Sequence, residues 1–268
     1  MFSLQNKTVV LTGAGGILVG EMALVLAQCG ANVALLDISK ESADRVAKEI
    51  KDKNGEVLSL QANVLDKDSL QSACNQIIDK YGKIDCLVNG AGGNISDATT
   101  SDTLSFFDIP IEIEKQVMDL NFIGTMLPCK VFGKEIVKLE QGSIVNIASI
   151  AGFRPLTRAA TYAAGKAAVI NFTKWLAVHI CQHYSPGIRV NAIAPGFFAT
   201  QQNKYLLFDE NGELTGRGHA ILNQVPQNRF GKPTELAGAL IWLLSDASSF
   251  CTGTVINVDA GFDVFAGV

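Results

Sequence analysis

Residues 8–17 read TVVLTGAGGI, and this stretch decides the fold. The Val- and Leu-rich run at its start predicts a strand, the glycines Gly13, Gly15 and Gly16 predict a tight turn, and the apolar residues from Ile17 onward predict a helix. Glycines in such a turn let the backbone approach a pyrophosphate, and the helix N-terminus supplies N–H donors for its charge. We therefore expect a phosphate-bearing ligand at the start of this helix.

The alternation of short apolar runs with longer segments of helical spacing continues along the chain. It predicts one α/β domain over residues 1–268, a doubly wound Rossmann fold whose parallel sheet is covered by helices on both faces. The expected seven strands are residues 8–12, 32–37, 56–61, 86–89, 143–149, 189–194 and 255–258. Residues 92–110 and 196–232 interrupt the alternation. We interpret the second as a helical substrate-loop insertion near 197–232, with a plain surface insertion as the alternative.

Composition limits the class of partner. Twenty-two Lys and Arg residues against 26 Asp and Glu give a net charge of −4, without a basic run, which disfavours nucleic acid or a membrane surface. The six cysteines are scattered without metal-ligand spacing, so we expect reduced thiols and no metal site. The opening residues lack a secretory pattern, and no long apolar run occurs. We expect a cytoplasmic protein with a small-molecule ligand.

Asp37 lies at the end of the second predicted strand. A carboxylate there can accept hydrogen bonds from both hydroxyls of an adenosine ribose, whereas it would repel a 2′-phosphate. Because only Lys40 follows closely, NAD(H) is favoured over NADP(H). The alternative is that Asp37 merely caps the next helix, ahead of Lys40 and Glu41.

Tyr162 and Lys166 are four residues apart and share one face of a predicted helix. A nearby ammonium stabilises a phenolate, so Tyr162 can exchange a proton with a carbonyl or alcohol oxygen. Ser149, at the end of a strand, lies on the ligand side of the sheet and can hold that oxygen. Its surroundings, NIASIAG, are not a nucleophile elbow, so a hydrolase is disfavoured. The alternative is an ordinary surface pair on a helix.

In combination these motifs resemble the classical short-chain dehydrogenases/reductases along nearly the whole chain. The resemblance rests on the TGAGG turn, Asp37, the NGAG run at 89–92, Asn121 in DLNFIGT, Ser149, Tyr162 with Lys166, Pro195-Gly196 and Thr200. The chain departs from the family at the turn, where the pattern TGxxxGxG would place glycines at Ile17 and Val19.

The resemblance implies a catalytic tetrad. In it Tyr162 is the general acid/base, Lys166 lowers its pKa and holds the nicotinamide ribose, Ser149 binds the substrate oxygen, and Asn121 holds a water in a proton relay. It also implies a homotetramer built from the two long helical regions and the last strand. The implied NAD(H) contacts are Gly13, Gly15, Gly16, Ile17, Asp37, Ile38, Asn63, Val64, Asn89, Gly90, Ala91, Tyr162, Lys166, Pro195, Gly196, Phe198 and Thr200.

The loops carry the information about substrate. Arg154, Arg158 and Arg217 are candidates for binding a substrate carboxylate, with solvated or interface arginines as the alternative. The expected substrate contacts are Asn94, Ser149, Arg154, Thr157, Tyr162, Gln202, Asn203 and Arg217.

Local runs such as NGAGGN, GFRPLT and APGFFATQQN resemble the D-mannonate oxidoreductase (fructuronate reductase) subgroup. This resemblance implies hydride transfer between NADH and D-fructuronate. A reductase of another sugar, a 3-oxoacyl or a steroid-like carbonyl, and a non-catalytic dinucleotide-binding regulator, remain alternatives. The apolar runs PGFF and YLLF keep the lipid-like substrates open.

Overall fold

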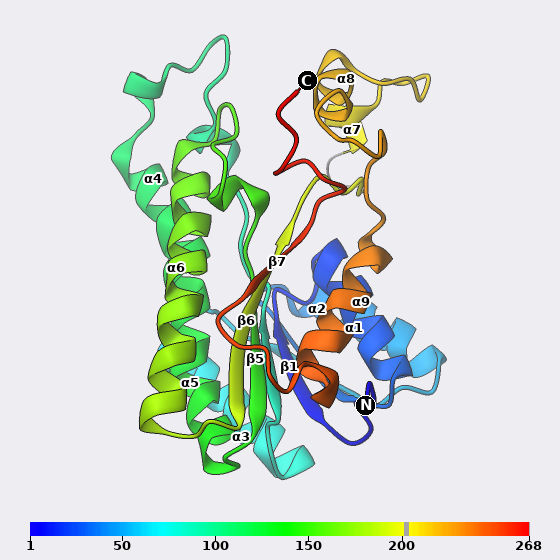
Figure 1. Ribbon diagram of the computed structural model, residues 1–268, viewed down its shortest axis with the longest axis vertical. Helices are drawn as coiled ribbons and strands as arrows, with labels where there is room; N and C mark the ends of the chain where they lie inside the picture. Colours follow the sequence, from blue (N-terminus) through cyan, green and yellow to red (C-terminus); the bar gives the residue numbers. More distant parts are fainter. Residues whose placement is uncertain (201–203, 268) are drawn as a thin grey trace.

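One parallel sheet organises the chain, and a computed structural model describes residues 1–200 and 204–267. The described strands pair in the order β3-β2-β1-β4-β5-β6-β7, all parallel (Figure 1). The direction of winding reverses between β1 and β4, which leaves a crevice at their carboxyl ends. The bounds are β1 Thr8–Thr12, β2 Asn32–Asp37, β3 Val57–Gln61, β4 Cys86–Asn89, β5 Gly142–Ile147, β6 Ile188–Pro195 and β7 Val255–Val258. The predicted fold is confirmed, with strand ends shifted by one or two residues.

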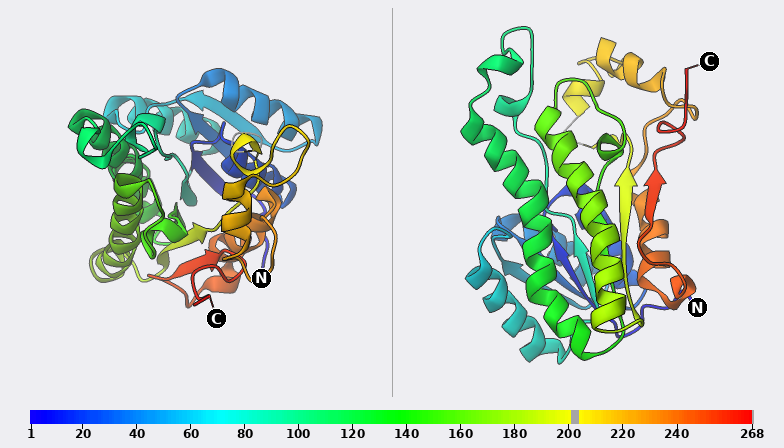
Figure 2. Two further views of the ribbon diagram at one scale, coloured as in Figure 1. Left: turned by 90° about the horizontal axis from the view of Figure 1, so that it is seen from above. Right: turned by 60° about the vertical axis from the view of Figure 1, so that its left-hand side comes forward.

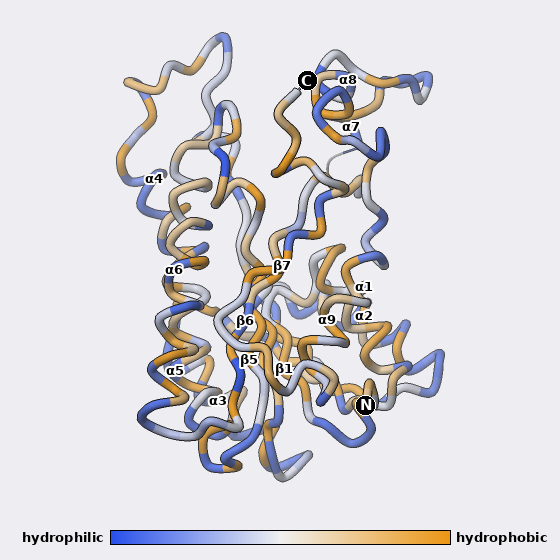
Figure 3. Tube along the Cα trace, in the orientation of Figure 1, coloured by the Kyte–Doolittle hydropathy of each residue, from blue (hydrophilic) through white to orange (hydrophobic). Residues whose placement is uncertain are grey.

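Helices cover both faces because the strands are apolar on both. Val9 and Leu11 of β1 pack under α1 (Ile17–Gln28), α2 (Lys40–Asp52) and α9 (Ala237–Leu244). Val10 faces the other layer, made of α3 (Lys67–Tyr81), α5 (Gly124–Lys138) and α6 (Ala160–His183). Figure 3 shows apolar residues along the central strands and also along the helices that cover them. Each strand therefore contributes to two separate cores.

The segments that break the alternation rise above the carboxyl ends of the strands (Figure 2). Residues 92–110 hold two short 3-10 turns, Ser96–Ala98 and Phe106–Asp108, before α4 (Ile111–Met118) and a π-helical turn, Asp119–Ile123. The later segment carries α7 (Lys204–Leu207) and α8 (Gly216–Leu222), as predicted for a helical insertion. Among the described residues no helix is long and apolar enough to cross a membrane. None of their His, Cys, Asp or Glu side chains gather into a metal-binding group.

Arg189 stabilises the amino-terminal end of the sheet, opposite the crevice. Its guanidinium is buried and donates to the carbonyl oxygens of Leu243 at 2.6 Å and Ser245 at 3.1 Å, and to Ser248 Oγ at 2.6 Å. These acceptors lie at and just beyond the end of α9, where helix carbonyls lack intrahelical partners. The arginine thus ties β6 to the helix that covers the neighbouring strands.

Arg189→Met should lower the free energy of unfolding by about 2–4 kcal/mol, because it removes three buried hydrogen bonds to a charged donor. Urea unfolding measures this change. The matched control is Arg229→Met, whose half-exposed side chain pairs with Glu235 and should cost at most about 1 kcal/mol. Equal losses for the two variants would contradict the assignment.

Candidate active site

The ends of β1 and β4 meet at a contact that tolerates no side chain. Gly13 has φ +67°, and a Cβ there would lie 2.7 Å from the Cα of Ala91. Just before it, the Thr12 hydroxyl accepts hydrogen bonds from the N–H groups of Gly90 at 3.2 Å and Ala91 at 3.3 Å. The glycine turn and the NGAG run therefore form one surface at the crevice.

Asp37 supports the turn directly. Its Oδ2 accepts from the Gly15 N–H at 2.9 Å and its Oδ1 from the Ser39 N–H at 2.9 Å. The cap of α2 is Ser39, whose Oγ accepts from Ser42 N–H, so Asp37 is not simply a helix cap. Asp37 therefore takes up the Gly15 N–H, and the expected contact of Gly15 with the cofactor stays a prediction.

The start of α1 keeps its N–H groups available. Gly16 is the N-cap and supplies no side chain to cap the helix, and the first turn, from Ile17, carries no acidic residue. Helix N-termini of this kind suit phosphate oxygens. Arg45 was missed by sequence reasoning: from α2 its Nη2 donates to the Gly15 carbonyl at 2.9 Å. Arg45 lies on α2 one to two turns after the Ser39 cap, and this spacing is the sequence signal that could have identified it.

The altered glycine pattern is compensated by packing. Val19 stands where the resemblance would place a glycine, and a Cβ on Gly90 would lie 2.4 Å from its Cγ2. Gly20, one position later, lets α1 pack on Val46 of α2, which would lie 3.1 Å from a Cβ. The close packing of α1 on α2 therefore depends on Gly20, and that of α1 on the loop after β4 depends on Gly90.

The expected adenine side has one exposed apolar group. Ile38 is 67% exposed next to Asp37, which is a high exposure for an isoleucine. Val64 is buried, whereas Asn63 turns to its own loop, where Oδ1 accepts from Leu65 N–H at 2.9 Å. Ile38 therefore offers an apolar surface for a flat ring.

Asn121 lies in the π-helical turn and is fully buried. Its Nδ2 donates to the carbonyls of Gly93 at 2.7 Å and Val117 at 2.8 Å, and its Oδ1 accepts from Gly93 N–H at 3.1 Å. Single π turns occur frequently at functional sites. The Asn121 side chain is thus occupied in fixing the loop after β4.

Gly92 ends the NGAG run and was not among the expected contact residues, yet it brings Asn121 and Lys166 together. A Cβ on Gly92 would lie 2.9 Å from Asn121 Oδ1 and 3.0 Å from Lys166 Nζ. Lys166 is buried and donates to the Ile147 carbonyl at the end of β5 at 2.8 Å. Burial lowers the pKa of Lys166 to about 8.

Tyr162 and Ser149 face each other at the same point. Their side chains share a hydrogen bond, and Ser149 Oγ also accepts from Ala151 N–H at 3.1 Å. Lys166 Nζ lies 5.8 Å from the centre of the Tyr162 ring. Burial raises the pKa of Tyr162, and the hydrogen bond with Ser149 offsets only part of that rise. The expected lowering of this pKa by Lys166 is therefore corrected, because the net shift in this structure is upward.

Asn89 does not point toward the crevice. Its Nδ2 donates to Asn146 Oδ1 at 2.9 Å and to Cys129 Sγ at 3.1 Å, and its Oδ1 is buried without a hydrogen-bond partner. Cys129 belongs to α5, so the side chain faces the helical layer. Strand alternation turns the Asn89 side chain into the core, so only its backbone faces the crevice, and the expected cofactor contact of Asn89 stays a prediction.

The substrate candidates are dispersed. Arg154 binds carbonyls of the C-terminal segment, so its expected role as a carboxylate ligand is corrected. Asn94 Nδ2 donates to Thr99 Oγ1 at 2.7 Å, and Arg217 is exposed on α8. Thr157 is exposed before α6, and Pro195 and Gly196 lie at the end of β6. Phe198 pairs with Gly231 in a β-bridge, and Thr200 is half-buried. Gln202 and Asn203 lie outside the described residues.

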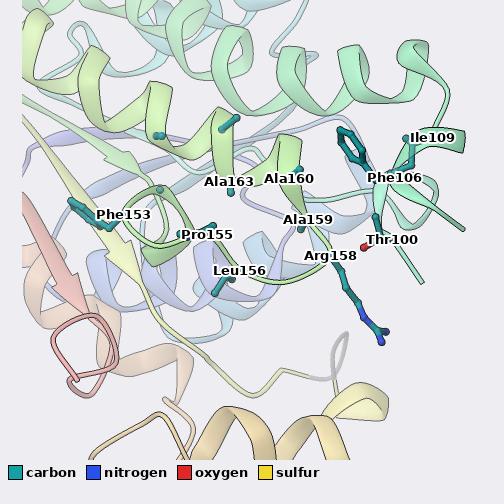
Figure 4. Close-up of a pocket in the computed structure, with 14 residues that line it drawn as sticks. Thr100, Phe106, Ile109, Phe153, Pro155, Leu156, Arg158, Ala159, Ala160 and Ala163 are labelled. Carbon is teal, nitrogen blue, oxygen red and sulfur yellow. The ribbon is translucent and has the colours of Figure 1, made fainter. Parts of the chain in front are cut away.

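A cavity of about 470 Å³ lies on the other side of α6 from Tyr162. Ala160, Ala163 and Ala167 line it at helical spacing, facing Phe106 and Ile109 of the 92–110 segment. Figure 4 shows Ala160 and Ala163 at the cavity, while the Arg158 side chain extends away from α6. None of the tetrad side chains lines this cavity.

Comparisons place these features among known proteins. Residues 18–263 match the family described as enoyl-(acyl carrier protein) reductase. An uncharacterized oxidoreductase of Haemophilus influenzae is 43% identical over 99% of this chain and 96% of its own length. A 3-oxoacyl-[acyl-carrier-protein] reductase of Synechocystis is 37% identical over 99% of this chain and all of its own. A crystal structure from Haemophilus, provisionally named D-mannonate oxidoreductase and holding NAD, has TM-score 0.94 and 42% identity, covering 99% and 98% of the two chains.

The lowered pKa of Lys166 links stability to pH. Between about pH 8 and 10.5 the unfolded chain holds a proton on this lysine that the folded chain has lost, so its contribution to stability rises with pH in that window. The unfolding free energy of the wild type relative to Lys166→Met should increase by about 3 kcal/mol from pH 7.5 to 10.5, measured by urea unfolding. Lys174→Met, on the exposed face of α6, is the control. If the unfolding free energies of wild type and Lys166→Met changed in parallel with pH, the lowered pKa of Lys166 would be refuted.

Proposed function

We propose that this chain, an NAD(H)-dependent oxidoreductase of the short-chain dehydrogenase/reductase family, acts on a sugar acid, with D-fructuronate and D-mannonate as its substrate pair. The observation that carries the activity is the convergence of Ser149, Tyr162 and Lys166 beside Gly92, next to the crevice. The same convergence disfavours a purely regulatory dinucleotide-binding protein. The homotetramer that the resemblance implies stays a prediction.

The residues around the crevice fit a dinucleotide. The uncapped start of α1 suits its phosphates, and Asp37, fixed by two backbone N–H groups, has a carboxylate suited to ribose hydroxyls. The same negative charge disfavours a 2′-phosphate, so NADH is preferred over NADPH. Exposed Ile38 suits the adenine ring. The Haemophilus structure with bound NAD supports this choice.

When bound, the nicotinamide supplies or accepts the hydride. In the reducing direction Tyr162 donates its proton to the substrate oxygen, and its raised pKa keeps the phenol protonated at neutral pH. Ser149 donates a hydrogen bond to the same oxygen and orients it. Lys166, anchored on the Ile147 carbonyl, places its ammonium beside the developing phenolate. Asn121 acts as a positioning residue through Gly93.

The position of the apolar cavity on α6 favours a sugar acid over a lipid-like substrate. The apolar cavity is lined by none of the tetrad side chains, so it offers no apolar lining at the phenol of Tyr162. Exposed Arg217 on α8 is available for a substrate carboxylate, and the name of the Haemophilus structure points to D-mannonate. A 3-oxoacyl reductase is the second candidate, since the Synechocystis relative carries that activity in its name.

NADH oxidation should be rapid with D-fructuronate and slow with 3-oxoacyl thioesters, and NADPH should be at least about tenfold poorer because of Asp37. Absorbance at the NADH band measures each rate, with D-mannonate and NAD in reverse. Turnover of the thioester alone would replace the sugar-acid proposal with the second candidate. NADH binding without turnover of any carbonyl would favour the regulatory alternative.

Tyr162→Phe should reduce kcat at least about 100-fold, since it removes the proposed proton donor. Its dissociation constant for NADH, measured by fluorescence, should stay within about threefold of the wild type. Tyr81→Phe, on α3 beside Glu56, is the matched control and should retain kcat. Retained turnover in Tyr162→Phe would rule out the proposed role.

A further inference from the structure

The chain turns sharply after β7 and crosses toward the inserted helices. Ala260 and Gly261 have φ +57° and +88°, and left-handed conformations in succession reverse the backbone. The Asp259 carboxylate accepts from the N–H groups of Gly261 at 3.0 Å and Asp263 at 2.8 Å. In Figures 1 and 2 the segment after β7 reaches the level of α8. We call residues 259–267 the tail.

Arg154 holds the tail from the loop after β5. Its Nη1 donates to the carbonyls of Phe262 at 2.8 Å, Asp263 at 3.2 Å and Phe265 at 3.3 Å. Its guanidinium also lies 5.4 Å from the centre of the Phe262 ring. A planar guanidinium can satisfy several carbonyls at once while stacking on a ring, which a neutral side chain cannot.

Phe262 connects the tail to the loops around the proposed site. It is buried in a cluster with Ile150 and Val225, and Ile221 of α8 packs against that cluster. Its ring meets Phe197 edge-on with centres 5.1 Å apart. Ile150 directly follows Ser149, and Phe197 directly follows the Pro195-Gly196 pair, so one ring links the segments after β5 and β6 to α8.

The backbone beneath the tail is also closely fitted. Gly196 donates its N–H to the Val258 carbonyl at 2.9 Å, and a Cβ at Gly196 would lie 2.6 Å from the Cα of Asp259. The end of β6 and the start of the tail are therefore fixed against each other. A displacement of the tail would be transmitted to the segment that follows β6.

We propose that the tail is a latch that holds α8 against the substrate side of the site, and that Arg154 is the positioning residue that fastens it. The latch itself rests on the contacts above, whereas its effect on substrate affinity rests on the proposed function. Arg154 then acts on every substrate, charged or neutral, through the placement of α8. An arginine that bound a carboxylate would affect acidic substrates alone.

Hydrogen exchange tests the latch without any assumption about the reaction. In Arg154→Ala, amides of residues 216–226 and 259–267 should exchange at least about tenfold faster, while those of β1 and β4 should be unchanged. Arg154→Lys, which retains donors for carbonyls, should give intermediate rates. Phe262→Leu is the second variant, in case Arg154→Ala does not fold. The control is Phe250→Leu, which changes an aromatic side chain that is fully exposed.

Kinetics then separates the latch from a carboxylate ligand. Arg154→Ala should raise KM about tenfold for D-fructuronate and for a neutral ketose alike, with kcat within about threefold and NADH affinity unchanged. Unchanged exchange at 216–226 would overturn the latch, as would a KM effect confined to acidic substrates. If the wild type turns over no carbonyl substrate, the proposed function fails, and the exchange measurement still decides the latch.

Discussion

The approach of Gly13 to Ala91 is the constraint on which the rest of the proposed site depends. Because the two backbones lie in contact at the reversal point of the sheet, the glycine turn and the loop after β4 become one surface. That loop continues into Gly92, where Asn121 and Lys166 converge. A side chain at position 13 would separate the two strand ends and move the loop away from both residues.

The proposed reacting groups are held mainly by backbone atoms. Lys166 bonds to a strand-end carbonyl and Asn121 to both polar groups of one glycine, and Asp37 is held by two N–H groups. Such partners do not depend on side-chain rotamers, so they fix buried polar groups with little freedom. Burial also moves the pKa values of Tyr162 and Lys166 in opposite directions, toward the neutral form of each. The phenol is therefore a weaker acid than an exposed tyrosine, and the ammonium of Lys166 releases its proton more readily than that of an exposed lysine.

The sequence predicted the strands and the placement of Tyr162, Lys166 and Ser149, because these follow from apolar periodicity and from spacing along one strand and one helix. It did not predict partners that lie far along the chain. Arg154 was interpreted as a substrate ligand, since its acceptors are more than a hundred residues away and are backbone carbonyls, which leave no pattern. The core partners of the Asn89 side chain, Asn146 and Cys129, also lie far along the chain, so the sequence did not indicate which way that side chain points. The pKa of Tyr162 depends on burial as well as on charge, and burial cannot be read from a four-residue spacing.

The two chain ends lie at opposite ends of the sheet, with the amino end near α9 and the carboxyl end beside α8 (Figure 1). Because Arg154 binds the carbonyl of Phe265, close to the last described residue, material fused to the carboxyl end would sit beside α8. An affinity tag or a reporter protein attached there would compete for the space above the strands. Attached at the amino end, the same fusion would lie on the side of the sheet that carries Arg189.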